Sequence, residues 1–294
     1  MVIRSFAALE GALAGCTGLR PAIAGAGDAG VMQALVAGLE TGLVQDAVLT
    51  GAADTPIPAE WRDRLRLLPA ETPTEAATLA VAEVRAGRAD VLVKGQVDSA
   101  AYLRAVVARG TGLRASGILS NLTLAEIPGM DRLIGATDNG IVPLPDLAQK
   151  RAMIANAVPL FHALGVQRPR VAAIAASEKV SAGQPATLDA RALALDPPAG
   201  VLVAGPFGYD VALSPAAARA KGLLDCPVAG RADLILFPSI EAGNATVKAW
   251  KLHAQARTAS IVLGARVPVL LNSRSDGPEA RRLGLILAAA LLRL

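Results

Sequence analysis

The chain has 294 residues, of which 53% are hydrophobic and 18% are charged, a composition that excludes an intrinsically disordered protein. Its 29 basic and 25 acidic residues give a net charge of +4, and no run of clustered Lys and Arg stands out, so a nucleic-acid partner has little support. Two cysteines and two histidines are too few for a disulfide framework or a histidine-rich metal centre.

The N-terminal segment contains a sequence that resembles a lipoprotein cleavage site, Leu13-Ala14-Gly15-Cys16. Glu10 interrupts the apolar stretch before it, and only one basic residue precedes that stretch. The segment instead predicts an amphipathic helix over 5–15, capped by its first residue, a serine. The apolar C-terminal stretch over 283–294 has 12 residues, fewer than the ~18 of a membrane span. We therefore expect a soluble, cytoplasmic protein with no membrane partner.

Short apolar runs alternate with longer helical patterns along most of the chain. The predicted strands are 21–25, 47–50, 66–68, 90–93, 171–175, 200–204, 233–237, 260–263 and 267–271. The predicted helices include 31–43, 74–86, 99–108, 146–164, 215–221, 242–256 and 278–292. Strands that alternate with helices favour doubly wound parallel sheets, and 294 residues exceed what one hydrophobic core usually organises. We expect two α/β/α lobes.

The alternation is interrupted once, between 117–126 and 132–137, which are separated by Ile127-Pro128-Gly129 rather than by a helix. This pattern predicts an antiparallel pair joined by a Pro-Gly turn. We place the crossover between the lobes directly after this pair, and we expect the final helix to return to the first lobe. The predicted domains are 1–138 plus 272–294, and 139–271.

The segment Gly25–Gly30 fits the GxGxxG pattern of dinucleotide-binding proteins, with a predicted strand before it and a predicted helix after it. Such a loop brings the backbone close to a pyrophosphate at the helix N-terminus. Asp28, however, would lie where the negative charge of the phosphate has to go. We favour the interpretation that Asp28 caps the helix that begins near Ala29.

Polar residues follow four of the predicted strands, at the sheet edge where open α/β folds bind ligands. They are Lys94-Gly95, the Gly205–Asp210 segment in which Gly-Pro predicts a turn, Glu241–Asn244 with Lys248, and Asn272–Glu279. Each cluster alone is compatible with a solvated strand end or a helix cap. Four clusters at one kind of edge favour a binding site for an anionic ligand, since Arg holds phosphate and a hydroxyl donates to an oxyanion.

At these residues the chain resembles the phosphate acetyltransferase/phosphate butyryltransferase family. The resemblance runs in family order through VLVKGQVDSAAYLRAV, TDNGI, SEKV, PATLDA, GPFGYDVALS, PVAGRADLILFPSIEAGN and VLGARVPVLLNSRSD. It implies a fold like that of isocitrate and isopropylmalate dehydrogenases, with an interlobe cleft, and a homodimer. It also implies reversible transfer of a short acyl group, butyryl or acetyl, between coenzyme A and inorganic phosphate. Coenzyme A is then a substrate, acyl phosphate is the other acyl carrier, and no cofactor or metal is expected.

The resemblance also assigns roles to residues. Ser273 matches the family serine that contacts the thiol or the tetrahedral intermediate, and Arg274 matches the arginine that neutralises phosphate. The acetyltransferases have a catalytic Asp seven residues beyond the serine, where this chain has Ala280. Asp276 and Glu279 are the nearby substitutes, and Asp276 is favoured because it completes a butyryltransferase-like Ser-Arg-x-Asp. The expected substrate-binding residues are Lys94, Gly95, Asp138, Gly205, Pro206, Asp210, Glu241, Gly243, Asn244 and Lys248.

Two alternatives stay open at this point. One is an NAD-dependent dehydrogenase on the same fold, although the carboxylate cluster that such enzymes use to hold a divalent metal is not evident. The other is a relative that binds coenzyme A or acyl phosphate but has lost turnover, which the displaced base allows.

Overall fold

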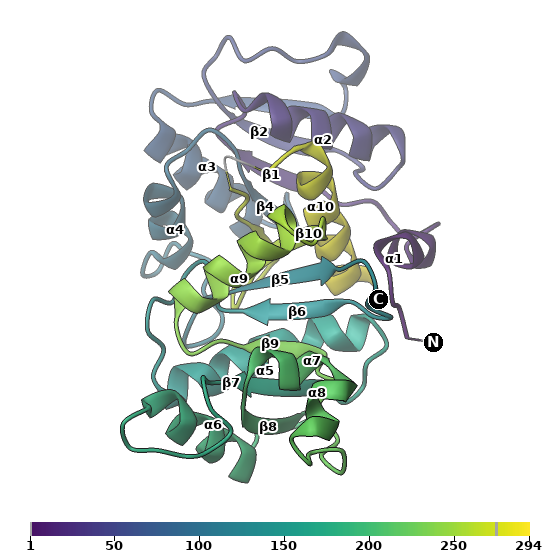
Figure 1. Ribbon diagram of the computed structural model, residues 1–294. Helices are drawn as coiled ribbons and strands as arrows, with labels where there is room; N and C mark the ends of the chain where they lie inside the picture. The colour runs from purple at the N-terminus through teal and green to yellow at the C-terminus, as the bar shows by residue number, and fades with distance from the viewer. Residues whose placement is uncertain (1, 274–275) are drawn as a thin grey trace. The chain divides into compact units, whose positions relative to one another are not determined.

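The computed structural model describes residues 2–273 and 276–294 (Figure 1). The chain divides into two compact units, each built from separate segments. Unit 1 comprises the residues up to Leu9 together with Ser116–Thr258, and unit 2 comprises Glu10–Ala115 together with Ala259–Leu294. The boundaries expected from the sequence, at 138/139 and 271/272, fall at other places in the chain than these divisions.

Unit 2 is a sheet flanked by helices. Its strands lie in the order β3-β2-β1-β4-β11-β10, and all neighbours are parallel except β10 and β11. The strands are β1 (Pro21–Ala24), β2 (Ala47–Gly51), β3 (Leu65–Pro69), β4 (Val91–Lys94), β10 (Arg257–Leu263) and β11 (Val269–Leu270). The helices are α2 (Ala29–Glu40), α3 (Pro73–Arg85), α4 (Ser99–Val107), α10 (Pro278–Arg293) and the 3-10 helix η1 (Ala59–Trp61).

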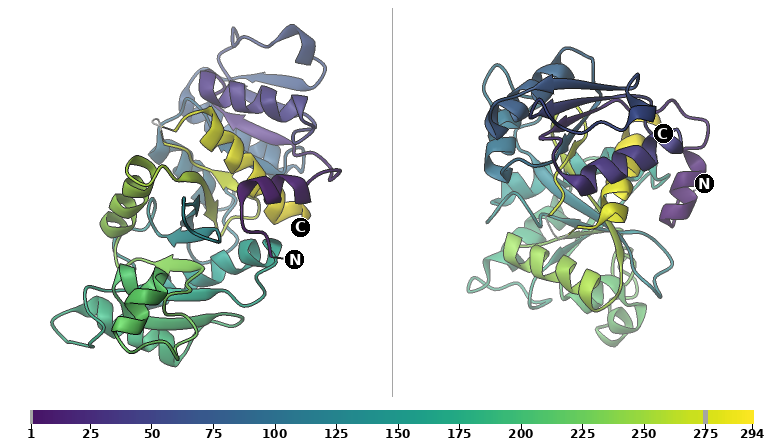
Figure 2. Two further views of the ribbon diagram at one scale, coloured as in Figure 1. Left: turned by 45° about the vertical axis from the view of Figure 1, so that its right-hand side comes forward. Right: turned by 90° about the horizontal axis from the view of Figure 1, so that it is seen from above.

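The helices of unit 2 cover both faces of its sheet. The chain moves from β1 to β2 in one direction across the sheet and from β3 to β4 in the other, so right-handed crossovers place α2 and α3 on opposite faces. Helix α10 packs against α2, and the two lie side by side in both views of Figure 2. Helix α3 packs against α4 and against β1 and β2.

The strands of unit 1 lie in the order β5-β6-β9-β7-β8, with both parallel and antiparallel neighbours. The strands are β5 (Ser120–Glu126), β6 (Ile134–Thr137), β7 (Arg170–Ile174), β8 (Leu202–Phe207) and β9 (Leu234–Leu236). The helices are α5 (Leu147–Ala163), α6 (Pro185–Leu195), α7 (Tyr209–Leu213), α8 (Pro215–Ala220) and α9 (Ile240–Leu252). Helix α1 (Phe6–Ala12) begins in unit 1 and ends in unit 2.

The predicted antiparallel pair is confirmed. Strands β5 and β6 pair antiparallel with Leu124 opposite Gly135, whereas β6 is parallel to β9, β9 to β7, and β7 to β8. The turn between β5 and β6 closes with a hydrogen bond from Met130 N to Ile127 O, and Gly129 has a φ of +85°. A positive φ strains residues with a Cβ, which explains the glycine after Pro128.

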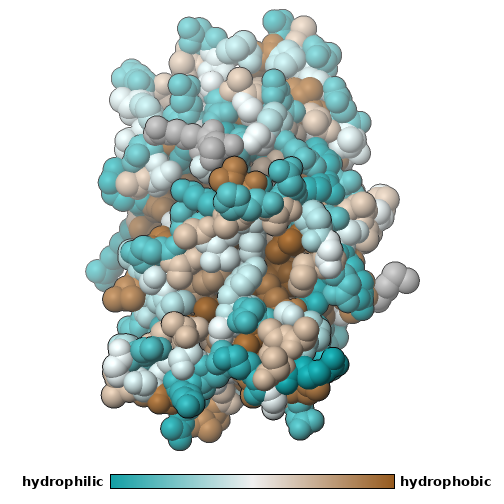
Figure 3. Space-filling model, in the orientation of Figure 1, coloured by the Kyte–Doolittle hydropathy of each residue, from teal (hydrophilic) through white to brown (hydrophobic). Residues whose placement is uncertain are grey.

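Short aliphatic side chains fill the core, as the low aromatic content requires. Every residue of β1, β2, β4 and β6 is buried, as expected for strands covered on both faces. On the face shown in Figure 3, hydrophobic residues are scattered among hydrophilic ones. None of the helices within 2–273 and 276–294 is long and apolar enough to cross a membrane.

Two features differ from the sequence prediction. Helices α6 and α7 were not predicted, and the Gly-Pro step at 205–206 forms no turn, because both residues lie within β8. Pro206 lacks a backbone N–H and is tolerated because β8 is the last strand of its sheet, where one side of the strand needs no partner. Gly205 is required where it is, since a Cβ there would lie 2.5 Å from Ala173 O.

Candidate active site

In unit 2 the candidate site lies at the carboxyl ends of β1, β4 and β11, which are parallel neighbours. The loops after β1 and β4 are joined by two backbone hydrogen bonds, Gly95 N to Ala24 O (2.8 Å) and Gln96 N to Gly25 O (2.7 Å). A Cβ on Gly95 would overlap with Gly25 O, so only glycine fits at this position. The close approach of these two loops therefore depends on Gly95.

Lys94, the last residue of β4, is 8% exposed. Its Nζ donates to Gly95 O at 3.3 Å. A solvated strand terminus is thereby excluded for Lys94, because burial removes its ammonium group from bulk water. A buried ammonium group at the ligand edge of a sheet attracts anions strongly, since screening by solvent is weak there.

Ser273 and Asp276, which lie between β11 and α10, are hydrogen-bonded to each other. Ser273 N donates to Asp276 Oδ2 at 2.8 Å, and Asp276 N donates to Ser273 O at 3.1 Å. Ser273 is exposed, Asp276 is half-buried, and Glu279 is exposed in the first turn of α10. Arg274, the predicted phosphate-binding residue, lies outside the described residues.

A buried arginine that was not among the predicted site residues contacts Asp276. Arg281 is 8% exposed, and its Nε donates to Asp276 O at 3.2 Å. Its Nη2 lies 3.3 Å from Asp28 Oδ2. Asp28 also accepts a hydrogen bond from Val31 N at 3.1 Å, which confirms the prediction that it caps α2. Arg281 thus links the loop after β1 to the segment that carries Ser273.

One feature of the sequence indicates that Arg281 has a carboxylate partner. Arg281 lies near the N-terminus of α10, where the helix dipole disfavours a cation. An arginine in such a position needs a carboxylate nearby, and the glycine-rich loop with Asp28 supplies one. The sequence does not show which acid that is, because the contact joins segments more than two hundred residues apart.

In unit 1 the carboxyl ends of β6 and β9 are neighbours, and Asp138 follows β6. Asp138 is 1% exposed. Its carboxylate accepts hydrogen bonds from the backbone N–H groups of Asn121 (2.8 Å), Gly140 (2.7 Å) and Ile141 (2.8 Å). Burial raises the pKa of Asp138, and the backbone hydrogen bonds act in the opposite direction. Asp138 therefore holds the shape of the turn after β6.

The start of α9 packs directly on this turn. Asn244 Nδ2 donates to Asn139 O at 3.0 Å, and a Cβ on Gly243 would overlap with Asp138 O. Asn139 Oδ1 in turn accepts from Asn121 Nδ2 at 2.7 Å. The structure thus brings together Asp138, Gly243 and Asn244, three of the predicted substrate-binding residues.

Glu241 and Lys248 lie on the same helix, and both are exposed. A hydrogen bond from the Ser239 side chain lowers the pKa of Glu241.

The carboxyl ends of β7 and β8 carry a third group of polar residues. Glu178 Oε1 accepts from Gly208 N at 3.1 Å, and its Oε2 pairs with Lys221 Nζ at 3.0 Å. The hydrogen bond from Lys221 lowers the pKa of Glu178. Asp210 is exposed in the first turn of α7, and its carboxylate is close to Gly208. Glu178 was not predicted as a site residue, although it lies in the SEKV segment.

No group of three or more His, Cys, Asp or Glu side chains is placed to hold a metal ion within the part of the chain that the structure describes.

Sequence comparisons identify the family. The profile of the family described as "Phosphate acetyl/butaryl transferase" matches residues 69–288. The chain is 39% identical over 229 residues to the probable phosphate butyryltransferase of Bacillus subtilis (strain 168), with 76% of each chain covered. It is 34% identical over 277 residues to the phosphate butyryltransferase of Clostridium acetobutylicum, with 91% of each chain covered. It is 38% identical over 218 residues to the phosphate acetyltransferase of Rhizobium meliloti, with 73% of this chain and 69% of that protein covered.

Solved structures agree in fold. A branched-chain phosphotransacylase from Enterococcus faecalis V583 superposes with a TM-score of 0.86 at 24% identity, covering 94% of this chain and 100% of the other. A phosphotransacetylase from Streptococcus pyogenes gives a TM-score of 0.79 at 19% identity, covering 97% and 98%. The resemblance drawn from the motifs is confirmed: the chain belongs to the phosphate acetyltransferase/phosphate butyryltransferase family and is a phosphate acyltransferase.

Proposed function

We propose that the protein reversibly transfers a short acyl group, butyryl or acetyl, between coenzyme A and inorganic phosphate, without forming an acyl-enzyme. The observation that carries this proposal is the family match over residues 69–288, which contains every residue assigned to the site. Coenzyme A enters as a substrate, and we propose no additional cofactor.

The chemistry is a direct displacement. Toward acyl-CoA, a carboxylate removes the proton of the coenzyme A thiol, because the thiolate is the nucleophile and a free thiol has a pKa near ~8.5. The sulfur attacks the carbonyl carbon of the acyl phosphate and forms a tetrahedral oxyanion. The C–O bond to phosphate then breaks, and the phosphate leaves with the electron pair.

Unit 2 supplies the reacting groups in this proposal. Asp276 acts as the base, and Glu279, one turn further along the chain, is the second candidate. Ser273 donates its hydroxyl to the thiol or the oxyanion, and its fixed geometry relative to Asp276 supports a joint role. Arg274 neutralises the phosphate, a role that suits the bidentate geometry of a guanidinium group. The buried ammonium group of Lys94 supplies a second positive charge.

Unit 1 supplies substrate-binding residues in this proposal. The turn after β6 and the start of α9 offer Asp138, Gly243 and Asn244, held together by the contacts described above. Exposed charges on α9 and α7 remain available for polar parts of coenzyme A. These further substrate-binding residues are Gly205, Pro206, Asp210, Glu241 and Lys248. We also propose that the enzyme acts as a cytoplasmic homodimer.

The test is the release of free thiol from acetyl-CoA and from butyryl-CoA. Release that requires phosphate, or arsenate in its place, is the expected result. Tight binding of coenzyme A with no release would instead support a relative that has lost turnover, a possibility raised by Ala280 at the position of the family's catalytic Asp. Formation of NADH from a hydroxy acid would support a dehydrogenase and contradict the proposal.

A further inference from the structure

Unit 1 contains a second polar site, at the edge of its sheet opposite to Asp138 and Glu241. A cavity of about 560 Å³ lies at the amino ends of β6, β7 and β9, where these parallel strands begin. Four arginines line it: Arg4, Arg132, Arg170 and Arg231. None of these residues belongs to the proposed catalytic machinery, and the volume is typical of a pocket for a small molecule, roughly 300–1,000 Å³.

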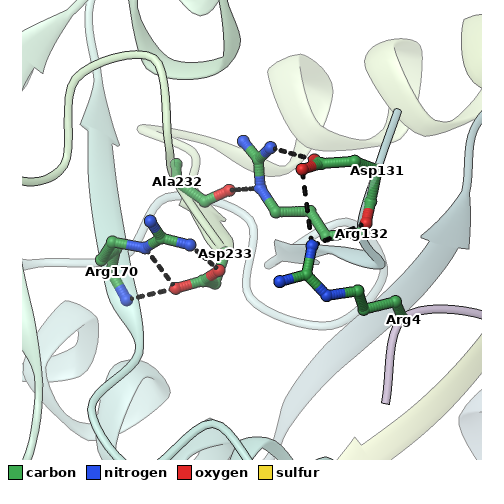
Figure 4. Close-up of polar contacts among 6 residues, drawn as sticks. All are labelled: Arg4, Asp131, Arg132, Arg170, Ala232 and Asp233. Carbon is green, nitrogen blue, oxygen red and sulfur yellow. Dashed lines mark hydrogen bonds and ion pairs between the residues drawn. The ribbon is translucent and has the colours of Figure 1, made fainter. Parts of the chain in front are cut away.

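Arg132 has a buried donor without an acceptor (Figure 4). Its Nε donates to Ala232 O at 3.1 Å, and its Nη1 donates to Asp131 Oδ1 at 2.9 Å. Its Nη2 is buried and has no hydrogen-bond partner among the described residues. A buried polar group left unsatisfied destabilises a protein, and more so when it is charged, so an acceptor that reached this group would be bound favourably.

The charges in the cavity do not balance. Arg170 holds Asp233 through two hydrogen bonds, from Nε at 2.9 Å and from Nη2 at 2.8 Å, which neutralises that carboxylate. Asp131 is shared by Arg132 and by Arg4, whose Nη1 lies 3.5 Å from Asp131 Oδ2. The four arginines exceed the two aspartates by two positive charges. A phosphate monoester carries about −1.5 to −2 at pH 7, which matches this excess better than a single carboxylate does.

The rest of the cavity wall is apolar. It is formed by Ile3, Met130, Leu133, Phe161, Val166 and Leu213. A ligand that fills the cavity therefore has a carbon portion as well as an anionic group. We propose that this cavity binds a small organic phosphate, with the phosphoryl group on the arginines and a short aliphatic portion against the apolar wall. This proposal is independent of the acyl transfer reaction.

The test uses the full chain labelled with ¹³C at the methionine methyl groups and butyl phosphate as the probe. The Met130 methyl resonance, assigned through a Met130→Leu variant, reports on the cavity, while Met32 in α2 of unit 2 reports on binding elsewhere. We expect a saturable change in the chemical shift of the Met130 methyl group as butyl phosphate is added. Half-saturation should require a lower concentration of butyl phosphate than of either control ligand. The controls are inorganic phosphate, which lacks the carbon portion, and butyrate, which carries a single charge.

Variants connect the signal to the arginines. Arg132→Gln should weaken binding by about 10-fold or more, because it removes a charged hydrogen-bonding group from the cavity wall. Arg231→Gln, at an exposed position, should weaken binding less and leave folding unaffected. Arg62→Gln in unit 2 is the control, because it removes the same charge outside the cavity. A Met130 signal unmoved by butyl phosphate would overturn the proposal. Equal affinities in the wild type and in both cavity variants would overturn it as well.

Discussion

At the scale of single residues, Arg281 explains how the segment with Ser273 is held. The guanidinium group is buried and contacts both Asp276 O and Asp28, so it holds Asp276 near the loop after β1. We therefore assign Arg281 a positioning role that acts through these neighbours. Small displacements of reacting groups reduce rates strongly, by about 10²-fold for 1 Å.

We predict that Arg281→Gln lowers kcat by about 10–100-fold because Asp276 and its partner Ser273 lose this support. The KM for the acyl substrate should change less. Arg281→Lys should recover part of the rate, since it restores the charge facing Asp28. The adjacent Arg282→Gln is the matched control, because Arg282 pairs with Glu10. A folded Arg281→Gln variant with wild-type kcat would contradict the positioning role.

Asp138 gives a prediction about pH. Because burial raises its pKa above the ordinary value of 3.8, the folded protein takes up this proton more readily than the unfolded chain. The stability that protonation contributes is complete below pH 3.8 and is lost as the pH rises through the raised pKa. The free energy of unfolding of the wild type, relative to Asp138→Asn, should therefore fall across this window. Urea denaturation at a series of pH values measures it.

Asp131→Asn is the comparison for which the free energy of unfolding should change with pH in the opposite direction. The hydrogen bond from Arg132 lowers the pKa of Asp131, so its contribution is present above the ordinary pKa and is lost as the pH falls. The effect should be small, since the side chain is 73% exposed. If the wild type instead gains stability relative to Asp138→Asn as the pH rises above 3.8, the raised pKa of Asp138 is contradicted.

At the scale of elements, the close contact between the loops after β1 and β4 depends on glycine. We predict that Gly95→Ala destabilises the protein by about 3 kcal/mol, the upper end of typical overpacking effects, because the new methyl group meets backbone and not a movable side chain. Gly117→Ala is the control, since nothing lies within 4 Å of a Cβ there. Chemical denaturation compares the two, and equal stabilities would mean that the loops separate without strain.

Most helices and strands are predictable because their burial leaves a pattern in the sequence. Buried parallel strands appear in the sequence as short aliphatic runs, and β1, β2 and β4 were located in this way. Helix α6 was missed because its N-cap, Gln184, makes no side-chain capping bond, so the usual start signal is absent. The extent of β8 was misjudged because Pro206 predicts a turn unless the strand is known to lie at an edge.

At the scale of the whole molecule, the candidate site was predictable where the chain itself places polar residues after strands. Lys94 ends β4, and Ser273 and Asp276 follow the neighbouring strand β11, so their position at a common edge follows from the topology. Arg281 and Glu178 were not predictable, because their importance comes from contacts with distant segments. The cavity with Arg132 was also hidden in the sequence, since its arginines come from four separate places in the chain.

The central claim is acyl transfer between phosphate and coenzyme A, and ³¹P NMR of the enzyme with butyryl phosphate tests it most directly. We predict that the acyl phosphate signal is stable until coenzyme A is added. It should then disappear as inorganic phosphate and butyryl-CoA form in equal amounts. Release of phosphate without coenzyme A would indicate a hydrolase, and an acyl phosphate signal that persists with coenzyme A would indicate a protein without turnover; either result would contradict the account.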